Sequence, residues 1–452
     1  MITLTFAELG AVLGCQPDDG STRFCGVSTD SRTVAPGMLF AALPGERVDG
    51  HEFIGQAVEA GAVAVLAQRA GPPIGVPQLV VDDVLAALGR LARAWRDRHQ
   101  PQVVAITGSN GKTTTKEMVA SILGLSGEVL ATAGNYNNEL GLPLTLFGLG
   151  AEHRYAVLEM GAAKAGDIAY LAGIAAPRVG LITNVGPAHL QGFGDEAGVA
   201  RAKGELYTAL PPDGVAVVNA DEPWRDMWLD SVSAGSTLLF GGGPHCDVWA
   251  EPSSQGHRIH SPAGTFEVRL HLPGRHNLQN ALAATAVACA LEVPREQIRA
   301  GLERTRPVPG RLNLDYARGG WTVIDDTYNA NPASLYAALQ VLAEVRGESW
   351  LVLGDMKELG PESRKMHAEM GDAAQALGVK RLFAIGEVTP ATVDAFGEGG
   401  RHFSDHQALI EVLCAELRPE VTCLVKGSRS MGMERVVHAI SGDCAGREVA
   451  EC

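Results

Sequence analysis

Residues 105–118 read AITGSNGKTTTKEM, and the way this stretch folds decides the architecture around it. The residues before its glycines, QVVAIT, are apolar and β-branched and predict a strand, which the glycine-rich GSNG cannot continue. KTTTKEMVASILG then has helical spacing in Met118, Ile122 and Leu123. Strand, glycine loop and helix in this order are typical of a phosphate-binding loop, although the usual pattern requires a glycine where this chain has Ile106.

Such a loop directs backbone N–H groups and the positive end of a helix dipole at one point, which stabilises a phosphate there. Lys112 would add a charge near the outer phosphates, and the Thr113 hydroxyl can hold Mg²⁺. The alternative is an ordinary strand-to-helix turn, but such turns rarely carry Gly-Lys-Thr-Thr at the helix start. The nucleotide-binding residues expected in the loop are Thr107, Gly108, Ser109, Asn110, Gly111, Lys112, Thr113 and Thr114.

The composition excludes several classes of protein. Of the 452 residues, 46% are hydrophobic and 20% charged, the usual mixture for large buried cores. A formal charge of −15 without a long basic run opposes binding to nucleic acid, and no apolar segment reaches the length of a membrane span. Eight cysteines without a C-x-x-C pair predict reduced thiols rather than a disulfide framework or a zinc site. We expect a monomeric protein of the cytoplasm.

The chain is predicted to be an α/β protein of three domains. Residues 1–100 alternate short strands with turns and end in the amphipathic segment VLAALGRLARAWRDRH. Residues 101–308 contain continuous apolar runs such as YAVLEMG and VGLITNVG, typical of buried parallel strands in a P-loop ATPase domain. The segment RTRPVPGRL interrupts the pattern, so that residues 309–452 form a second strand-and-helix series, a Rossmann-like domain.

Polar residues that follow the apolar runs are candidates for the site, because parallel strands end together beside the phosphate loop. Glu159 would place a carboxylate near Mg²⁺; the alternative is an exposed acid at a strand end. His189 is a candidate second metal ligand, although a lone histidine is more often structural. Lys203, in AKGELY, reads by default as a solvated helix lysine.

Two further positions have a functional and a structural interpretation. Asn277 and Asn280 lie at the start of a strong predicted helix, so that Asn277 either caps this helix or, with Asn280, contacts the nucleotide. Arg311, in the segment between the second and third domains, is placed where a guanidinium could reach a phosphate.

Eight motifs in order resemble the Mur ligases, amide-forming ATP-dependent enzymes of peptidoglycan precursor synthesis. They are TGSNGKTT, TAGNYNNELGLPLTL, EMGA, NVGPAHLQGFG, AKGELY, GRHNLQNALAA, PGRL and DDTYNANP. The resemblance covers nearly the whole chain and explains the missing glycine, since family members use a TGSNGKT-type loop. DSR, GDMKELG and KGSRSMGME, together with DDTYNANP, are similar to the branch that adds D-alanyl-D-alanine to UDP-N-acetylmuramoyl-tripeptide.

The resemblance implies roles for individual residues. Lys112, His189, Lys203 and Arg311 would be catalytic, and Mg²⁺, two ions in all, would be held by Thr113, Glu159, His189 and a carbamylated Lys203. ATP would also contact Asn277, Asn280, Arg311, Asp326 and Tyr328. Ser31 and Arg32 of the first domain would bind the UDP part of the substrate, and Asn137 and Asn138 would line the muramoyl-peptide path. Asp355 and Arg429 would lie nearest the acceptor dipeptide in the third domain, unless they only build its loops.

Three other functions are alternatives to this one. A sister ligase that adds the third residue, diaminopimelate or lysine, or a folylpolyglutamate-synthetase-like enzyme would share every nucleotide motif. The Asp-Asn-Pro-Arg motif usual for diaminopimelate is absent. A switch or transport ATPase should show Asn-Lys-x-Asp or Leu-Ser-Gly-Gly-Gln, which are also absent. A catalytically dead binding protein would be expected to lack Lys112 or Glu159, and both are present.

Overall fold

The stretch around the glycine loop forms strand β7 (Gln102–Thr107) and helix α4 (Lys112–Leu123), as predicted. The computed structural model describes residues 1–442, apart from 18, 46–47, 72–73, 188–189 and 346. Strand β7 lies inside a six-stranded parallel sheet with the order β12-β11-β10-β7-β9-β8. Its other strands are β8 (Glu128–Ala131), β9 (His153–Glu159), β10 (Val179–Ile182), β11 (Val215–Asn219) and β12 (Ser236–Phe240).

Helices cover both faces of this central sheet, which is why its strands are apolar on both sides. One face packs against α4, α10 (Arg275–Ala290) and α11 (Arg295–Arg304). The helices on the opposite side of the sheet are α5 (Gly141–Leu146), α6 (Asp167–Ala175), α8 (Glu196–Thr208) and α9 (Arg225–Ser231). The short helix α7 (Leu190–Phe193) precedes α8.

A small antiparallel sheet in the central part was not predicted from the sequence. Its strands are β13 (Trp249–Ser253), β14 (Gly256–His260) and β15 (Phe266–Val268). Ile259, Phe266 and Val268 are buried in the core of α4, α10 and α11. Charged residues such as Arg258 and Glu267 pair on the exposed side, so this region lacks the long apolar runs by which the parallel strands were recognised.

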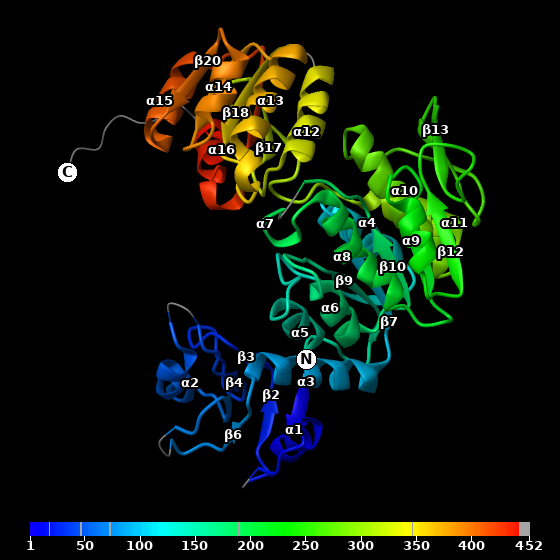
Figure 1. Ribbon diagram of the computed structural model, residues 1–452, viewed down its shortest axis with the longest axis vertical. Coiled ribbons are helices and arrows are strands. Elements are labelled where there is room, and N and C mark those ends of the chain that lie inside the picture. The colour runs from blue at the N-terminus through cyan, green and yellow to red at the C-terminus, as the bar shows by residue number, and fades with distance from the viewer. Residues whose placement is uncertain (18, 46–47, 72–73, 188–189, 346, 443–452) are drawn as a thin grey trace, which may run out of the picture.

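The N-terminal part has a two-stranded antiparallel sheet, β1-β2, and a four-stranded parallel sheet, β3-β4-β5-β6 (Figure 1). The strands are β1 (Thr3–Thr5), β2 (Arg23–Cys25), β3 (Val27–Ser28), β4 (Leu39–Ala41), β5 (Ala64–Ala67) and β6 (Gln78–Val80). The helices are α1 (Phe6–Leu13), the 3-10 helix η1 (Gly50–Phe53), α2 (Ile54–Glu59) and α3 (Val84–His99).

Helix α3 joins the N-terminal part to the central sheet. Its buried side, which includes Leu88, Leu91 and Trp95, belongs to the same apolar core as the inner residues of α5 and α6. The Trp95 indole also donates a hydrogen bond to the Leu149 carbonyl at 3.1 Å. The two parts therefore share one hydrophobic core rather than meeting across a polar surface.

The C-terminal part is a six-stranded sheet with the order β16-β17-β21-β18-β19-β20, parallel except for β16. The strands are β16 (Asn313–Tyr316), β17 (Thr322–Asp326), β18 (Glu348–Gly354), β19 (Arg381–Ile385), β20 (Gly400–Phe403) and β21 (Val421–Lys426). The helices are α12 (Pro332–Glu344), η2 (Gly360–Glu362), α13 (Ser363–Ala376), α14 (Pro390–Phe396), α15 (His406–Glu416), η3 (Arg429–Met431) and α16 (Glu434–Ser441). Helices α12, α13 and α14 cover one face, and α15 and α16 cover the other.

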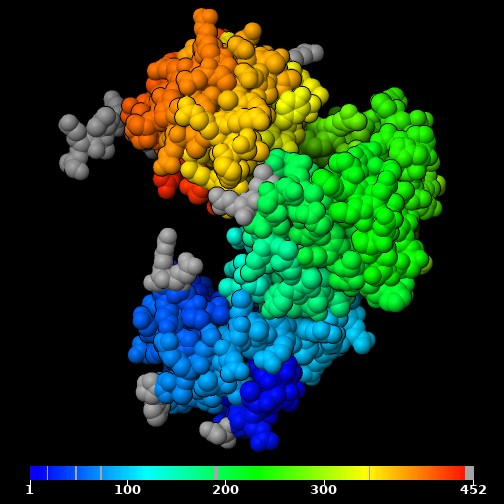
Figure 2. All heavy atoms as spheres, viewed as in Figure 1, coloured from blue at the N-terminus to red at the C-terminus, as the bar shows by residue number. Residues whose placement is uncertain are grey.

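The predicted α/β class with three domains is confirmed by these sheets. Residues 305–312, which contain no helix or strand, connect α11 to β16. Figure 2 shows that the N-terminal and C-terminal parts stand apart on the visible face, each next to the central part, with an open hollow between them.

Two expectations from the composition have different outcomes. Within the described ranges, no helix is long and apolar enough to cross a membrane. Cys15, Cys25, Cys246, Cys289 and Cys423 are free thiols. Cys414 is disulfide-bonded, so the prediction of reduced cysteines is wrong at this residue.

The shared core predicts the effect of truncating α3. Leu91→Ala should lower the free energy of unfolding by about 2–5 kcal/mol, because Leu91 is fully buried between two parts of the molecule. Leu85→Ala, on the same helix but only half-buried, should cost clearly less. Urea unfolding followed by circular dichroism measures both, and an equal loss for the two variants would contradict the shared core.

Candidate active site

The phosphate loop connects β7 to α4 and is confined by two neighbouring segments. Gly108 has φ +148° and Gly111 has φ +80°, conformations that favour glycine. A Cβ at Gly108 would lie 1.9 Å from Thr183 Oγ1, and one at Gly111 would lie 2.4 Å from Asn280 Oδ1. Ile106, where the usual pattern has its first glycine, is instead a fully buried residue of β7. The late first glycine therefore reflects a strand that continues through Ile106 to Thr107, so that the first glycine comes two residues later than in the common motif.

The backbone N–H groups of the loop divide into two sets. Those of Lys112, Thr113 and Thr114 lie in the first turn of α4, where an α-helix provides no acceptor for them. Those of Ser109 and Asn110 already donate to the carbonyl and side-chain oxygens of Asn184, each at 2.9 Å. Of these N–H groups, those available to an anion are therefore the three at the start of α4, fewer than the whole loop would offer.

The hydroxyl groups around the loop are mostly occupied by its own structure. Thr107 donates to the Met160 carbonyl at 2.8 Å, and Ser109 exchanges two hydrogen bonds with the backbone of Gly186. Lys112 folds back over the loop and donates to the Gly108 carbonyl at 2.8 Å. Burial lowers the pKa of Lys112, and the nearby Glu159 carboxylate partly opposes this shift.

Glu159 and Thr113 form the oxygen-rich side of the site. The Glu159 carboxylate is buried and accepts from the Thr113 hydroxyl at 2.8 Å and from the Asn137 amide at 2.9 Å. A carboxylate next to a hydroxyl at the end of a phosphate loop is a donor set that fits Mg²⁺, which needs few protein ligands when phosphates complete its coordination. Glu159 is therefore not the exposed strand-end acid of the alternative interpretation.

Of the other two predicted metal ligands, His189 and Lys203, the structure describes only Lys203. His189 lies outside the described residues. Lys203 is buried on α8 rather than solvated, and no carboxylate within the described ranges forms an ion pair with it. Burial, together with the charge of Lys112, lowers the pKa of Lys203 to about 7. In the same ranges no three residues among His, Cys, Asp and Glu cluster as a metal site.

The C-terminal part contributes a guanidinium to the loop. Arg311 donates to the Thr113 hydroxyl at 3.0 Å, and its Cζ lies 4.1 Å from the centre of the Tyr328 ring. Its buried Nε has no hydrogen-bond partner among the residues described, which leaves a donor for an anionic ligand. Asp326, two residues before Tyr328, forms a buried ion pair with Lys426 at 2.5 Å, and burial raises its pKa.

The two asparagines of α10 are both buried beside the loop. Asn280 donates to Asn277 Oδ1 at 3.1 Å, and Asn277 donates to the Pro273 carbonyl at 2.7 Å. The interpretation of Asn277 as the helix cap is wrong, because α10 begins two residues earlier and Gly274 precedes it without a side-chain cap. Asn280 instead limits the space beside Gly111.

The substrate residues predicted for the N-terminal domain lie apart from the loop. Ser31 donates to the Gln56 side chain at 3.0 Å, and Arg32 forms an exposed ion pair with Asp30 at 2.6 Å. The Arg32 guanidinium lowers the pKa of Asp30 to about 2. Asn138 accepts from the Gly141 N–H at the start of α5, whereas Asn137 lies at Glu159.

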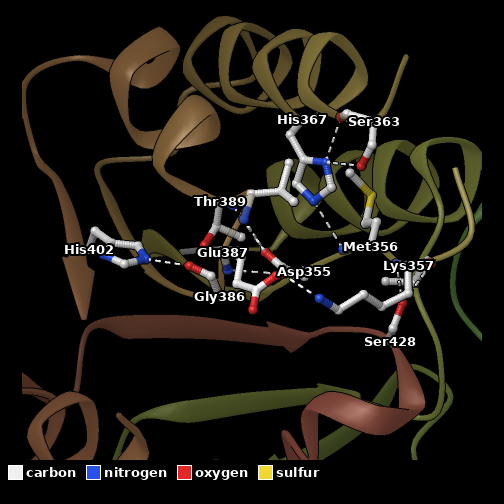
Figure 3. Close-up of polar contacts among 12 residues, drawn as sticks. Asp355, Met356, Lys357, Ser363, His367, Gly386, Glu387, Thr389, His402 and Ser428 are labelled. Carbon is white, nitrogen blue, oxygen red and sulfur yellow. Dashed lines mark hydrogen bonds and ion pairs between the residues drawn. The ribbon is translucent and has the colours of Figure 1, made fainter. Parts of the chain in front are cut away.

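Asp355 occupies the interior of the C-terminal domain (Figure 3). Its carboxylate is fully buried and accepts from the backbone N–H groups of Glu387, Val388 and Thr389 and from the Lys357 ammonium at 2.8–3.0 Å. These bonds favour the alternative left open by the sequence, a structural role in the loop after β19. Arg429 is exposed, pairs with Glu434 at 3.6 Å and lies 6.0 Å from the Tyr328 ring centre.

Two residues of the site were missed from the sequence. Asn184 lies two residues after the end of β10 and holds the loop; the rule that selected Glu159, a polar residue just after an apolar run, would have found it. Asn331 lies at the end of the DDTYNANP motif and donates to Asn110 Oδ1 at 2.8 Å, a contact across 221 residues of sequence that no local pattern indicates.

Comparisons with known proteins agree with this geometry. The families described as "Mur ligase family, catalytic domain", "Mur ligase middle domain" and "Mur ligase, glutamate ligase domain" match residues 23–96, 106–288 and 310–429. The chain belongs to the Mur ligase family. It is 42% identical to UDP-N-acetylmuramoyl-tripeptide–D-alanyl-D-alanine ligase of Escherichia coli (strain K12), over 98% of this chain and 100% of that protein.

Solved structures give the same result. A crystal structure of MurF from Acinetobacter baumannii has a TM-score of 0.91 and 37% identity, covering 98% of this chain and 99% of that chain. MurF ligase from Thermotoga maritima in complex with ADP has a TM-score of 0.82 and 30% identity, covering 92% and 97%.

The confinement of the loop predicts a specific defect. Gly111→Ala should weaken ADP binding by at least about tenfold, since the new Cβ would be strained and would collide with Asn280. Gly378→Ala is the matched control, because Gly378 has φ +83° but nothing within 4 Å of a new Cβ. Isothermal titration with ADP measures both, and normal ADP affinity in Gly111→Ala would contradict the geometry described.

Proposed function

We propose that this protein is an ATP-dependent ligase that joins D-alanyl-D-alanine to UDP-N-acetylmuramoyl-tripeptide, releasing ADP and phosphate. The observation that carries the proposal is the similarity at 42% identity over 98% of the chain to a ligase with that name. The nucleotide loop and the guanidinium that reaches it from the C-terminal domain provide the chemistry. The sister ligase that adds the third residue is the alternative and is not favoured by these relatives.

The proposed reaction has two steps. An oxygen of the tripeptide carboxylate attacks the γ-phosphorus of ATP; the bond to the bridging oxygen breaks, giving an acyl phosphate and ADP. The amine of D-alanyl-D-alanine then attacks the acyl carbon, phosphate leaves with the electron pair of the broken C–O bond, and the amine loses a proton. Negative charge gathers at the transferred phosphoryl group in both steps, and preorganised cations stabilise it.

The residues of this chain would act mainly by binding and charge neutralisation. The N–H groups at the start of α4 would bind the phosphates of ATP, and Lys112 would move from the Gly108 carbonyl to the outer phosphates. Arg311 has a donor available for the same charge. Asn277 and Asn280 would line the nucleotide beside Gly111, and Asp326 and Tyr328 would meet its ribose and adenine.

Thr113 and Glu159 would hold Mg²⁺, which supplies Lewis-acid stabilisation of phosphate charge. His189 and a carbamylated Lys203 complete the proposed ligand set by resemblance to the family. A buried lysine that forms no ion pair with a carboxylate of the described residues supports the carbamate, because the modification replaces an uncompensated buried cation with an anion that a metal can bind.

The two other substrates would bind on either side of this site. The UDP end is assigned to Ser31 and Arg32, the muramoyl peptide to Asn137 and Asn138, and the acceptor to the C-terminal domain near Arg429. Asp355 would support the acceptor loop from inside rather than contact the dipeptide. The proposed protein is a monomer and works in the cytoplasm, where ATP and UDP-linked precursors are available.

Acceptor selectivity tests the proposed function. With UDP-N-acetylmuramoyl-tripeptide, ADP release should require D-alanyl-D-alanine and should not respond to diaminopimelate or lysine.

Arg429→Ala should raise the KM for the dipeptide about tenfold, ~1.4 kcal/mol, and leave the KM for ATP unchanged, because an exposed arginine can bind the dipeptide carboxylate. If ADP release instead requires UDP-N-acetylmuramoyl-dipeptide and diaminopimelate or lysine, the sister assignment is correct.

Removal of the lysine side chain tests the carbamate. Lys203→Ala should lose most activity and regain part of it with formate or acetate, whose carboxylate can occupy the vacated metal-binding position. The wild type with the same salts is the control and should show no stimulation. A fully active Lys203→Ala variant would show that the carbamate is not needed.

A further inference from the structure

Asn331 has two simultaneous hydrogen-bonding roles at the start of α12. Its Oδ1 accepts from the Ser334 N–H at 2.9 Å, and the Ser334 hydroxyl accepts from the Asn331 N–H, which together form a capping box. The cap uses only the side-chain oxygen. The side-chain nitrogen is directed away from α12 and donates to Asn110 Oδ1 in the phosphate loop at 2.8 Å.

Asn110 is held on its other side by the central domain. Its N–H donates to Asn184 Oδ1 at 2.9 Å, and its carbonyl accepts from Asn184 Nδ2 at 3.0 Å and from the Thr183 hydroxyl at 2.7 Å. The peptide group of Asn110 is therefore fixed to the end of β10, and only its side chain is free to reach the C-terminal domain. Because the backbone of Asn110 is fixed, a movement of α12 would directly displace the Asn110 side chain or break its bond to Asn331.

Helix α12 also contacts two segments of the central domain, one at each end of the helix. A Cβ at Gly186 would lie 3.8 Å from the Ala333 methyl group, and one at Gly274 would lie 2.7 Å from the Val341 side chain. Helix α12 thus runs from the phosphate loop to the start of α10. Asp326 and Tyr328, which the proposed function assigns to the nucleoside, lie only a few residues before Asn331.

We propose that the Asn110–Asn331 hydrogen bond is an interdomain latch that sets the spacing between the phosphate loop and the nucleoside-facing segment of the C-terminal domain. Asn331 is then a positioning residue for ATP rather than a catalytic one. A helix cap alone does not require asparagine, since serine and aspartate cap as well. The amide nitrogen is the part of the side chain that only the latch uses.

A set of variants separates the latch from the cap. Asn331→Ser keeps a hydroxyl acceptor for the Ser334 N–H and removes the donor to Asn110, whereas Ser334→Ala removes half of the capping box and leaves the latch. Asn110→Ala removes the acceptor but keeps the backbone bonds to Asn184. The full-length chain is used throughout, with the Kd for ADP from isothermal titration and the KM for ATP and kcat from ADP release.

The expected result is a rise in the Kd for ADP and in the KM for ATP of about two- to tenfold in Asn331→Ser, with kcat and Tm close to wild type. Ser334→Ala should lower Tm without changing either nucleotide constant. The double variant Asn110→Ala/Asn331→Ser should bind ADP no more weakly than the weaker single variant, because one shared bond is lost.

Two outcomes would overturn the latch: unchanged ADP affinity in Asn331→Ser, or single-variant effects that multiply in the double variant. The inference rests on the proposed function only in its use of ATP. If the wild type binds ADP but does not join D-alanyl-D-alanine to the tripeptide, the proposed function fails while the ADP titrations still decide the latch.

Discussion

The parallel pairing of β7 with its two neighbours is the constraint on which the site depends. Ile106 pairs with Glu159 of β9 on one side and with Leu181 of β10 on the other. Strands in register must end together, so the loop after β7 emerges between a carboxylate on one side and the Thr183–Asn184 peptide on the other. The tight glycines, the Thr113–Glu159 hydrogen bond and the clamp by Asn184 all follow from this register.

Much of this arrangement could be predicted because its signals are local. The strand, the glycine loop and the helix follow one another in the sequence, each with its own residue pattern, and Glu159 comes directly after an apolar run. The small sheet β13-β14-β15 was missed because its strands carry paired charges on one side and so lack a continuous apolar run. Capping, one of the two interpretations of Asn277, is wrong because Arg275 already begins the helix and Gly274 is its N-cap residue, and a glycine before a helix gives a weaker start signal than asparagine.

The contacts between domains could not be predicted, since they join residues far apart in sequence. Arg311 was expected to reach a phosphate, but its stacking on Tyr328 and its bond to Thr113 depend on how the C-terminal sheet is placed. Asp355 shows the opposite difficulty. A polar residue after a strand resembles a site residue in sequence, but here the register brings three backbone N–H groups onto its carboxylate and encloses it.

The shared core around α3 determines which parts of the molecule can change their relative positions. Rotation of the N-terminal part against the central sheet would expose Leu88, Leu91 and Trp95 to water, at a cost of several kcal/mol by area. The C-terminal part is connected by residues 305–312 and by polar contacts that can be exchanged for water at much lower cost. The N-terminal and central parts therefore form one rigid unit that fixes the distance from the Ser31 region to the phosphate loop, and the C-terminal domain is the part whose position would cost least to change.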